Sequence, residues 1–469
     1  MSTTENFSTV LAELRDQLPA DAVVDDPRAL SVYQYDRSGH LSDTVPSAAV
    51  FPRTVEEVQH IARVCFHHRI PMVPRGAGTG LAGSAIGSSG EIMVCTDRMN
   101  QILQLQPENR SVTVQPGILN GELNTYLATQ GFWWPPDPAS KDISTVGGNI
   151  SMNAGGLLCA KYGVTREAVL SLKVVLADGS LITVGHQTVK GVTGYDLCAL
   201  MIGSEGTLGI IVEATLKIRP LTPGSTVTLG ASFPTVTDAA EAASAVTRHG
   251  HTPAMMELLD DLTVALVTEH TGENFGSGNS FLLIQTDGPA AATEAEEIGA
   301  ILTDHQAELA ITDDPEESQR LVGIRRSVFP SLEAKGQLLV EDIAVPRSTM
   351  AEAFARIRDL EQASGIKIPT ACHAGDGNLH PVFVVEGQDH GQNREVPEAI
   401  WDVAGQVFTM ALELGGTLTG EHGVGVLKSR WLPDELGDVQ YRLQQNIKAA
   451  FDPHNLMNPG KVFRPAPIA

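Results

Sequence analysis

Three glycine-rich stretches in the first half constrain this chain more than any other sequence feature. They span residues 75–84, 144–156 and 203–211. Because glycine lets successive main-chain N–H groups turn toward one anion, each stretch can form a cradle for a phosphate. One phosphate needs only one such loop. Three loops in one domain therefore indicate an extended ligand, such as a dinucleotide that carries a flat ring system.

The first stretch contains Gly78, Gly80 and Gly83 in the spacing Gly-x-Gly-x-x-Gly, with Asp97 further along. This pattern matches a Rossmann fingerprint, which must open a helix. Here the following residues are rich in Gly and Ser and lead into an expected strand, so we reject a Rossmann site. No Gly-Lys-Ser/Thr follows, which excludes a P-loop. Taken alone, the loop fits a structural turn equally well.

The three stretches together resemble the FAD domain of the vanillyl-alcohol oxidase superfamily, over about residues 46–220. They read Pro-Arg-Gly-x-Gly-Thr-Gly, Thr-Val-Gly-Gly-Asn-x-x-x-Asn-Ala-Gly-Gly and Gly-Ser-Glu-Gly-Thr-Leu-Gly. The resemblance implies that the first grips the pyrophosphate, the second lines the flavin and the third lies along the nucleotide. It implies noncovalent FAD, because the first loop lacks His, Cys and Tyr. The cofactor-binding residues it implies are Arg75, Gly76, Ala77, Gly78, Thr79, Gly80, Pro138, Thr145, Gly148, Asn149, Asn153, Gly155, Gly156, Glu205, Gly206, Gly209, Ile211 and Asn458.

In the second half, His373 and His380 flank the turn sequence Gly-Asp-Gly-Asn, between two expected strands. A four-residue loop at 375–378 would make the two histidines a cross-strand pair, with Cβ atoms ~5 Å apart. That separation suits two imidazoles on one cation. Cys372 would alternate to the opposite face and pack there. The alternative is that these are turn residues without a ligand.

Glu421 and His422 lie within Gly-Gly-Thr-Leu-Thr-Gly-Glu-His-Gly-Val-Gly. The flanking glycines let both side chains approach one site from an irregular backbone. A His-His-Glu set leaves coordination positions open, as catalytic metals require. The alternative is a turn with a capping acid.

The two motifs resemble the C-terminal domain of FAD-linked D-2-hydroxy-acid dehydrogenases. This family includes D-lactate dehydrogenase, D-2-hydroxyglutarate dehydrogenase and the glycolate oxidase large subunit. The resemblance implies that His373, His380 and Glu421 hold zinc or manganese and that His422 is the catalytic base. It also implies that Arg325 binds the substrate carboxylate, whereas the alternative is an exposed arginine on a helix face.

Two departures from the 2-hydroxyglutarate dehydrogenases bear on the substrate. Val340 stands where they have a Lys, and Val382 stands where they have an Asn. Loss of these polar groups favours a small D-2-hydroxy monocarboxylate, above all D-lactate, which is oxidised to the 2-oxo acid. The alternatives are the FAD subunit of a glycolate oxidase complex, a 2-hydroxyglutarate dehydrogenase, a metal-dependent hydrolase and a noncatalytic subunit. The sequence does not decide whether the electron acceptor is a quinone, a cytochrome or an electron-transfer flavoprotein.

Charge and cysteine content limit partners and location. The net charge of −24 disfavours nucleic acid as a partner. The five scattered cysteines, the absence of a signal-peptide pattern at Met1–Glu5 and the lack of an apolar run of ~20 residues indicate a cytoplasmic protein. Peripheral contact with the inner membrane through the electron acceptor is the alternative. The oligomeric state is open, with a homodimer as the candidate.

The expected fold class is α+β, with three segments. An N-terminal helical segment covers residues 1–45, a PCMH-type (p-cresol methylhydroxylase-type) FAD-binding domain covers 46–222, and a substrate- and metal-binding domain covers 223–469. In the last segment, expected strands and helices interleave, which favours helices covering a sheet.

Overall fold

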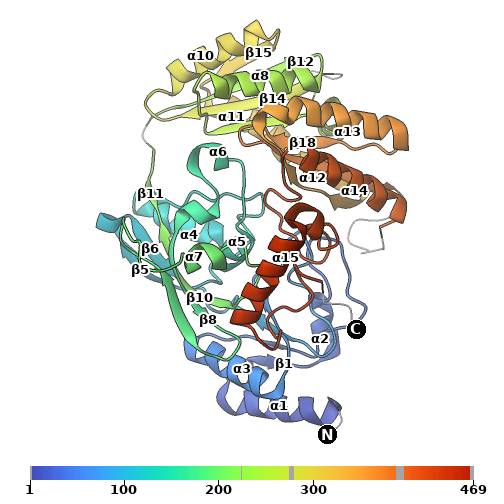
Figure 1. Ribbon diagram of the computed structural model, residues 1–469. Helices are drawn as coiled ribbons and strands as arrows, with labels where there is room; N and C mark the ends of the chain where they lie inside the picture. Colours follow the sequence, from blue (N-terminus) through green and yellow to red (C-terminus); the bar gives the residue numbers. More distant parts are fainter. Residues whose placement is uncertain (1–2, 223, 274–278, 387–395, 465–469) are drawn as a thin grey trace. The chain divides into compact units, whose positions relative to one another are not determined.

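A computed structural model describes residues 3–222, 224–273, 279–386 and 396–464 (Figure 1). Its contacts divide the chain into two compact units. Unit 1 comprises Met1–Ala154, Val164–Leu221 and Glu421–Ala469, and unit 2 comprises Gly155–Gly163 and Thr222–Gly420.

This division differs from the contiguous segments expected from the sequence. The main junction lies after Leu221, next to the expected boundary, but residues 1–45 and 421–469 belong to unit 1 and residues 155–163 belong to unit 2. The end of the chain returns to unit 1, where Met457 pairs with Met72. Met72 N donates to Leu456 O at 2.7 Å, and Asn458 N donates to Met72 O at 2.7 Å. Such long-range pairing leaves no local pattern in the sequence.

Unit 1 contains a mainly parallel sheet that carries the first glycine loop. Its strands, in spatial order, are β1 (Val23–Val24), β2 (Ala48–Val50), β4 (Ile92–Cys95) and β3 (Met72–Arg75). Strands β2, β4 and β3 run parallel, and α3 (Val55–His68) connects β2 to β3. Thr54 caps α3, and its buried face packs with α1 (Thr3–Gln17) into one core. The loop therefore begins at the carboxyl end of a parallel strand.

A second, antiparallel sheet in unit 1 supports the other two glycine stretches. Its strands, in spatial order, are β5 (Ile102–Gln106), β6 (Ser111–Val114), β10 (Ile210–Lys217), β8 (Val169–Val175) and β9 (Leu181–Gly185). Its core includes residues from α4 (Asn120–Thr129), α5 (Val146–Met152) and α7 (Leu197–Met201). The remaining elements are α2 (Pro27–Leu30), the pair β7 (Phe132–Trp133) and β11 (Arg219–Pro220), and α15 (Leu432–Phe451).

Unit 2 is built on one antiparallel sheet. Its strands, in spatial order, are β15 (Glu308–Thr312), β12 (Thr226–Phe233), β14 (Ser280–Asp287), β13 (Met255–Leu259), β18 (Thr370–His373), β19 (Asn378–Glu386) and β16 (Gly336–Val340), with β17 (Ile343–Ala344) also on β19. Every residue of β13 is buried, so both faces of the sheet are covered there. Charged residues on such a strand need partners inside the protein.

Helices cover this sheet on both faces, and Figure 1 shows α8, α13 and α14 in a row. The helices of unit 2 are α6 (Cys159–Tyr162), α8 (Val236–Arg248), α9 (Asp261–Thr271), α10 (Ala291–Asp304), α11 (Pro315–Arg326), α12 (Val328–Glu333), α13 (Met350–Ser364) and α14 (Glu398–Glu413). The sequence analysis missed α9, which is rich in β-branched residues, and β15, a short edge strand.

The predicted fold class is confirmed, because antiparallel sheets carry helices packed on their faces. No helix in the described ranges is both long enough and apolar enough to cross a bilayer.

Candidate active site

The first glycine loop starts at Arg75, where β3 ends. Arg75 Nη1 donates to the main-chain oxygens of Tyr35 at 3.0 Å and Ala85 at 2.6 Å. A Cβ at Gly78, whose φ is +70°, would overlap the Arg75 guanidinium. The Arg75 side chain thus stabilises the loop by donating to main-chain oxygen atoms of the protein. Gripping a pyrophosphate remains a prediction for the N–H groups of residues 76–80.

The second glycine stretch forms the helix α5, which the sequence analysis did not expect. Thr145 caps it, because its Oγ1 accepts from Gly148 N at 3.1 Å. A Cβ at Gly76 would overlap Thr145 Oγ1, so the first and second stretches are in direct contact. The helix ends at Asn153, which has φ +52° and accepts from Arg166 N at 2.9 Å. The side chains of Thr145 and Asn153 therefore also shape the loop.

Glu205, in the third stretch, joins all parts of this region. Its main-chain N donates to Ser151 O at 2.8 Å, which links it to α5. Its carboxylate accepts from Ser84 Oγ in the first loop, and from Val424 N and Gly425 N at 2.8 Å each. Burial raises the pKa of Glu205, while these donors act in the opposite direction. Its side chain is committed to the protein, so only its main chain is left to lie along a nucleotide.

The buried polar atoms of unit 1 that have no hydrogen-bond partner among the described residues include Ser144 Oγ, Asn149 Nδ2 and Asn458 Oδ1. Asn458 lies beside the glycine loops, because its Nδ2 donates to Ser84 O and Glu205 O at 2.8 Å each. Buried polar atoms are nearly always bonded in folded proteins. Their lack of partners fits a bound ligand with many polar atoms, such as FAD.

The segment that carries Glu421 and His422 is anchored in unit 1. Val426 N donates to Ala82 O at 3.0 Å, and a Cβ at Gly425, whose φ is +50°, would overlap that same oxygen. His422 Nε2 lies 3.8 Å from Glu421 Oε1. The glycine is therefore required by close approach of two main-chain segments as well as by backbone freedom.

Several residues expected to bind the cofactor belong to unit 2 or pack against neighbouring strands of unit 1. Gly155 and Gly156 open the short segment that belongs to unit 2. Ile211 packs in the hydrophobic core of the five-stranded sheet, and its place along the nucleotide stays a prediction. A Cβ at Gly209 would meet Val174, so strand packing accounts for this glycine.

Two further residues from that expected set sit at turns. Gly206 has φ +69° and packs against Pro74. Pro138 accepts a turn hydrogen bond from Lys141 N at 2.8 Å. Their conformations are compatible with the predicted loops and do not by themselves indicate a ligand.

The histidine hairpin differs in register from the prediction. His373 pairs with Asn378, and His380 pairs with Ala371, so the loop spans residues 374–377. Gly377, in this loop, has φ +86°, and its main chain lies so close to Val345 that a Cβ would overlap Val345 O. The histidines still share one face as diagonal neighbours, with ring centroids 5.0 Å apart and both side chains buried. Cys372 faces the other side, as expected, and its Sγ lies 3.9 Å from Met350 Sδ.

A buried carboxylate, Glu257 on β13, lies directly opposite His373. His373 Nδ1 is 2.7 Å from Glu257 Oε1 and 2.9 Å from Oε2. Arg325 Nε donates to Glu257 Oε2 at 2.7 Å. Arg325 is 7% exposed, which rejects the alternative of an exposed arginine, whereas Arg326 is exposed. The structure thus joins a predicted metal ligand and the predicted substrate arginine through one acid.

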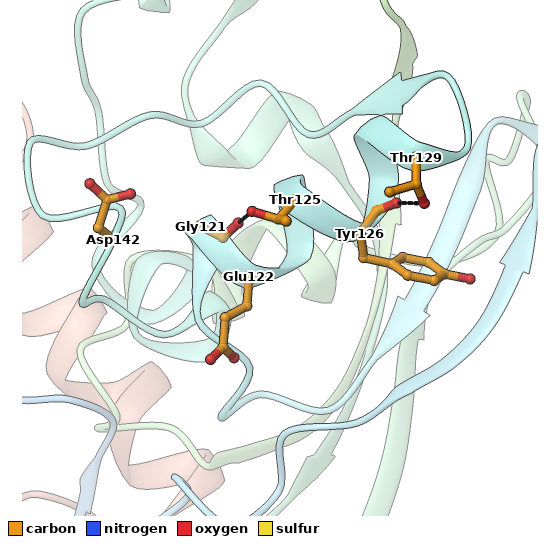
Figure 2. Close-up of a pocket in the computed structure, with 6 residues that line it drawn as sticks. All are labelled: Gly121, Glu122, Thr125, Tyr126, Thr129 and Asp142. Carbon is orange, nitrogen blue, oxygen red and sulfur yellow. Dashed lines mark hydrogen bonds between the residues drawn. The ribbon is translucent and has the colours of Figure 1, made fainter.

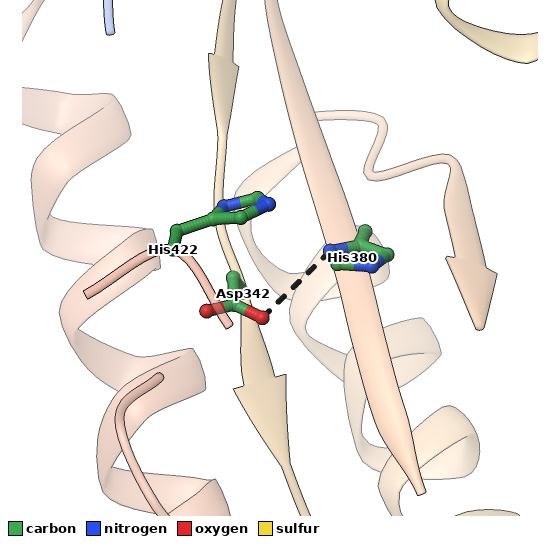
Figure 3. A group of neighbouring side chains, drawn as sticks. All are labelled: Asp342, His380 and His422. Atoms are coloured by element: carbon green, nitrogen blue, oxygen red, sulfur yellow. Dashed lines mark ion pairs between the residues drawn. The ribbon is translucent and has the colours of Figure 1, made fainter. Parts of the chain in front are cut away.

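A second buried carboxylate, Asp342, lies beside His380 (Figure 3). Its Oδ1 is 3.9 Å from His380 Nδ1 and accepts from Asn378 Nδ2 at 2.7 Å. Its Oδ2 accepts from Thr419 Oγ1 at 2.5 Å. The segment that ends unit 2 at Gly420 therefore runs beside the histidine hairpin, and Glu421 is the next residue in the chain.

Figure 2 shows a surface depression along α4, lined by Gly121, Glu122, Thr125, Tyr126, Thr129 and Asp142. The hydroxyls of Thr125 and Thr129 donate to the helix's own carbonyl groups. The depression contains no histidine, cysteine or basic residue. It offers no catalytic set comparable with the histidine hairpin.

Comparison with protein families decides what this chain is. Residues 46–185 match the FAD binding domain family, and residues 222–462 match the family described as FAD linked oxidases, C-terminal domain. The chain belongs to the FAD-linked oxidases. It is an FAD-dependent oxidoreductase, and the predicted cofactor FAD is confirmed.

Curated relatives of this FAD-linked oxidase match over most of their length. It is 39% identical over 437 residues to glycolate oxidase subunit GlcD of Bacillus subtilis, with 92% of each chain covered. It is 33% identical to D-lactate dehydrogenase of Anaerostipes hadrus, with 89% of each covered. It is also 33% identical to the mitochondrial D-lactate dehydrogenase [cytochrome] of Arabidopsis thaliana, with 91% of this chain and 75% of the relative covered.

Solved structures confirm the predicted fold of the FAD-linked oxidase. p-Cresol methylhydroxylase superposes with a TM-score of 0.79 at 18% identity, covering 98% of this chain and 97% of the other. 4-Ethylphenol oxidase from Gulosibacter chungangensis superposes with a TM-score of 0.78 at 17% identity, covering 99% and 98%. At these identities the likeness establishes the fold alone.

The sequence analysis missed Glu257 and Asp342, the two acids beside the histidines. An available signal for Glu257 was a lone acid in the apolar run Ala-Met-Met-Glu-Leu-Leu, because a charge on a buried strand needs a partner. That signal could not identify His373 as the partner, since 116 residues separate the two.

Proposed function

We propose that this FAD-linked oxidase oxidises a small D-2-hydroxy monocarboxylic acid, D-lactate above others, to the 2-oxo acid. The names of its relatives support the substrate class. One observation carries the proposal: His373 of the histidine pair and Arg325 contact the same acid, Glu257. A hydroxyl-binding cation and a carboxylate-binding guanidinium would then be neighbours. A 2-hydroxy acid carries its hydroxyl and carboxylate on adjacent carbon atoms, which matches that arrangement.

Arg325 would bind the substrate carboxylate. Its Nε is bonded to Glu257, and among the described residues its two terminal nitrogens make no hydrogen bond. Two terminal nitrogens in one plane can donate in parallel to the two oxygens of a carboxylate. Because Arg325 is buried, this charge-assisted contact would be only weakly screened by solvent.

The donor set also fits a divalent cation. His373 and His380 offer two buried imidazoles on one face, and Thr419, two residues before Glu421, contacts the acid beside His380. When bound, zinc or manganese held by His373, His380 and Glu421 would supply a Lewis acid for the substrate hydroxyl. His422 would accept the hydroxyl proton on an imidazole nitrogen, since imidazole titrates near neutral pH. When bound, FAD supplies the acceptor for the hydride from the α-carbon.

The apolar pair Val340 and Val382 supports a monocarboxylate. The two residues are cross-strand partners on β16 and β19, and Val382 lies two residues after His380. Both pack with the core cluster that also contains Ile324, the neighbour of Arg325. A second substrate carboxylate directed there would lose hydration without gaining a donor. Such a loss costs about 1–3 kcal/mol, or at least ~10-fold in kcat/KM.

Substrate-dependent flavin reduction, followed by absorbance in stopped flow, tests this function. D-lactate should lead D-2-hydroxyglutarate by at least ~10-fold in kcat/KM. Arg325→Lys should lower kcat/KM for D-lactate by roughly 10- to 100-fold, because lysine cannot offer the planar pair of donors. The exposed neighbour supplies the matched control, so Arg326→Lys should leave kcat/KM unchanged. Equal effects of the two substitutions, or a profile led by 2-hydroxyglutarate, would contradict the proposal.

Glycolate is the second candidate substrate, because the B. subtilis relative is a glycolate oxidase subunit and matches over 92% of each chain. The same assay with glycolate decides between the two acids. A profile led by glycolate, with turnover only after a partner subunit is added, would favour the subunit role. A cytochrome is the favoured electron acceptor, because the Arabidopsis relative is named for a cytochrome, with a quinone or an electron-transfer flavoprotein as alternatives.

We also propose that FAD is held noncovalently. The first glycine loop contains no His, Cys or Tyr that could attach the flavin. Acid precipitation of the purified protein should release all of the yellow colour into the supernatant. Colour retained on the precipitated chain would refute this assignment.

A further inference from the structure

Glu257 is a buried acid beside the predicted metal and substrate residues, with 1% of its surface exposed. It lies on β13, next to the strand that carries His373, and it contacts Arg325 in the last turn of α11. Both of its carboxylate oxygens are within 3.0 Å of His373 Nδ1, and Oε2 also accepts from Arg325 Nε. One side chain therefore fixes two functional residues at once.

We propose that Glu257 is a positioning residue that directs His373 Nε2 to the cation and the terminal nitrogens of Arg325 to the substrate carboxylate. This inference rests on the proposed function and adds to it the group that orients both residues. An ionised carboxylate only accepts hydrogen bonds, so His373 Nδ1 must carry the hydrogen in this contact. The lone pair of the neutral ring is then on Nε2, which becomes the ligand atom.

The charges of the cluster support this assignment. A buried carboxylate without a counter-charge is strongly unfavourable, and Arg325 supplies the counter-charge at 2.7 Å. In return, Glu257 fixes Arg325 through Nε. The guanidinium is rigid and planar, so fixing Nε also fixes the direction of the two terminal nitrogens.

The second histidine has a similar neighbour. Asp342 lies beside His380 Nδ1 at 3.9 Å, and is itself held by Asn378 and Thr419. Both imidazoles thus have a buried carboxylate on their Nδ1 side, so we assign Nε2 of each ring as the ligand atom. Only Glu257, however, also contacts Arg325, so only its loss should weaken both metal and substrate binding.

The test uses the full-length FAD-loaded protein, stripped of metal with a chelator and titrated with zinc and with manganese by calorimetry. Glu257→Gln keeps the volume but removes the charge and one acceptor. We expect metal affinity to fall roughly 10- to 100-fold, with flavin content unchanged. The KM for D-lactate should also rise, because Arg325 loses its partner. His373→Ala serves as the reference for loss of a ligand.

Asp260→Asn is the matched control. Asp260 is a buried acid that directly follows β13, and its carboxylate accepts from the main-chain N–H groups of Thr263 and Thr370. It should leave metal affinity and KM at wild-type values, whatever it does to stability. Glu257→Asp, which keeps the charge on a shorter side chain, should restore part of the metal affinity if Glu257→Gln proves poorly folded.

The outcomes separate this inference from the proposed function. Glu257→Gln with wild-type metal affinity and KM, in a protein that turns over D-lactate, would overturn the positioning role alone. Equal loss in Asp260→Asn would also overturn it, because the effect would then reflect general disturbance of the unit. Failure of the wild-type protein to bind metal or to oxidise any 2-hydroxy acid would overturn both.

Discussion

The most direct test of how the flavin-binding unit is held together is Glu205→Gln. The Glu205 carboxylate accepts three hydrogen bonds, from Ser84 Oγ, Val424 N and Gly425 N. In the variant, the new NH2 can face Ser84, whose hydroxyl rotates to accept. One main-chain N–H then loses its acceptor, whichever way the amide is turned. A buried donor left without a partner costs about 1–3 kcal/mol.

We therefore expect the melting temperature of Glu205→Gln to fall by roughly 3–8 °C, measured by release of flavin fluorescence on heating. The difference from wild type should shrink at acidic pH. Burial raises the pKa of Glu205, so this carboxyl becomes protonated earlier than an exposed glutamate as the pH falls. The protonated carboxyl then resembles the amide of the variant. Glu213→Gln is the control, since its ion pair with Lys173 is partly exposed and contributes at most about 1 kcal/mol. If both variants melt with the wild type, Glu205 does not clamp this region.

Three further predictions concern single residues. Gly425→Ala should destabilise the protein well beyond Gly437→Ala, because both have positive φ but only Gly425 lies against a main-chain oxygen. Equal melting temperatures would remove the close-approach argument. Burial raises the pKa of Asp260 to about 7, so its contribution to stability is present at pH 4 and lost as pH rises through 7. Relative to Asp260→Asn, the wild type should lose about 2 kcal/mol between pH 5 and 8 in urea unfolding, and a constant difference would contradict the shift. His422→Asn should lower turnover by ~100-fold or more while metal analysis shows full occupancy, whereas loss of metal would make His422 a ligand.

Local patterns were sufficient for much of the fold. Strand β12 and helix α10 are bounded by turn residues and have clear periodicity, so their existence could be predicted from the sequence. The helix α5 could not, because Val-Gly-Gly-Asn has low helix propensity and forms a helix only with Thr145 as its cap. Edge strand β15 has half-exposed residues and little hydrophobic signal.

The features of the candidate site also divide into those that local sequence motifs predicted and those that they did not. Motifs in the sequence named His373, His380, Glu421 and Arg325, because histidine, carboxylate and guanidinium chemistry at recognisable spacing is a local property. The hairpin register did not follow from the turn pattern, and in the structure Gly377 of this loop lies against Val345. A one-residue shift of the loop changed the partners of both histidines while keeping them on the same face.

What the sequence by itself determined is the family, the cofactor and the chemical types at the site, since these follow from motifs within a few residues of each other. What only the tertiary structure decided is how distant residues satisfy one another's charges. Glu257 reaches His373 and Arg325 across 116 and 68 residues, and Glu205 reaches Val424 across 219. Buried charges must find partners, but the partner is chosen by the packing of strands and helices, and a one-dimensional pattern does not contain that packing.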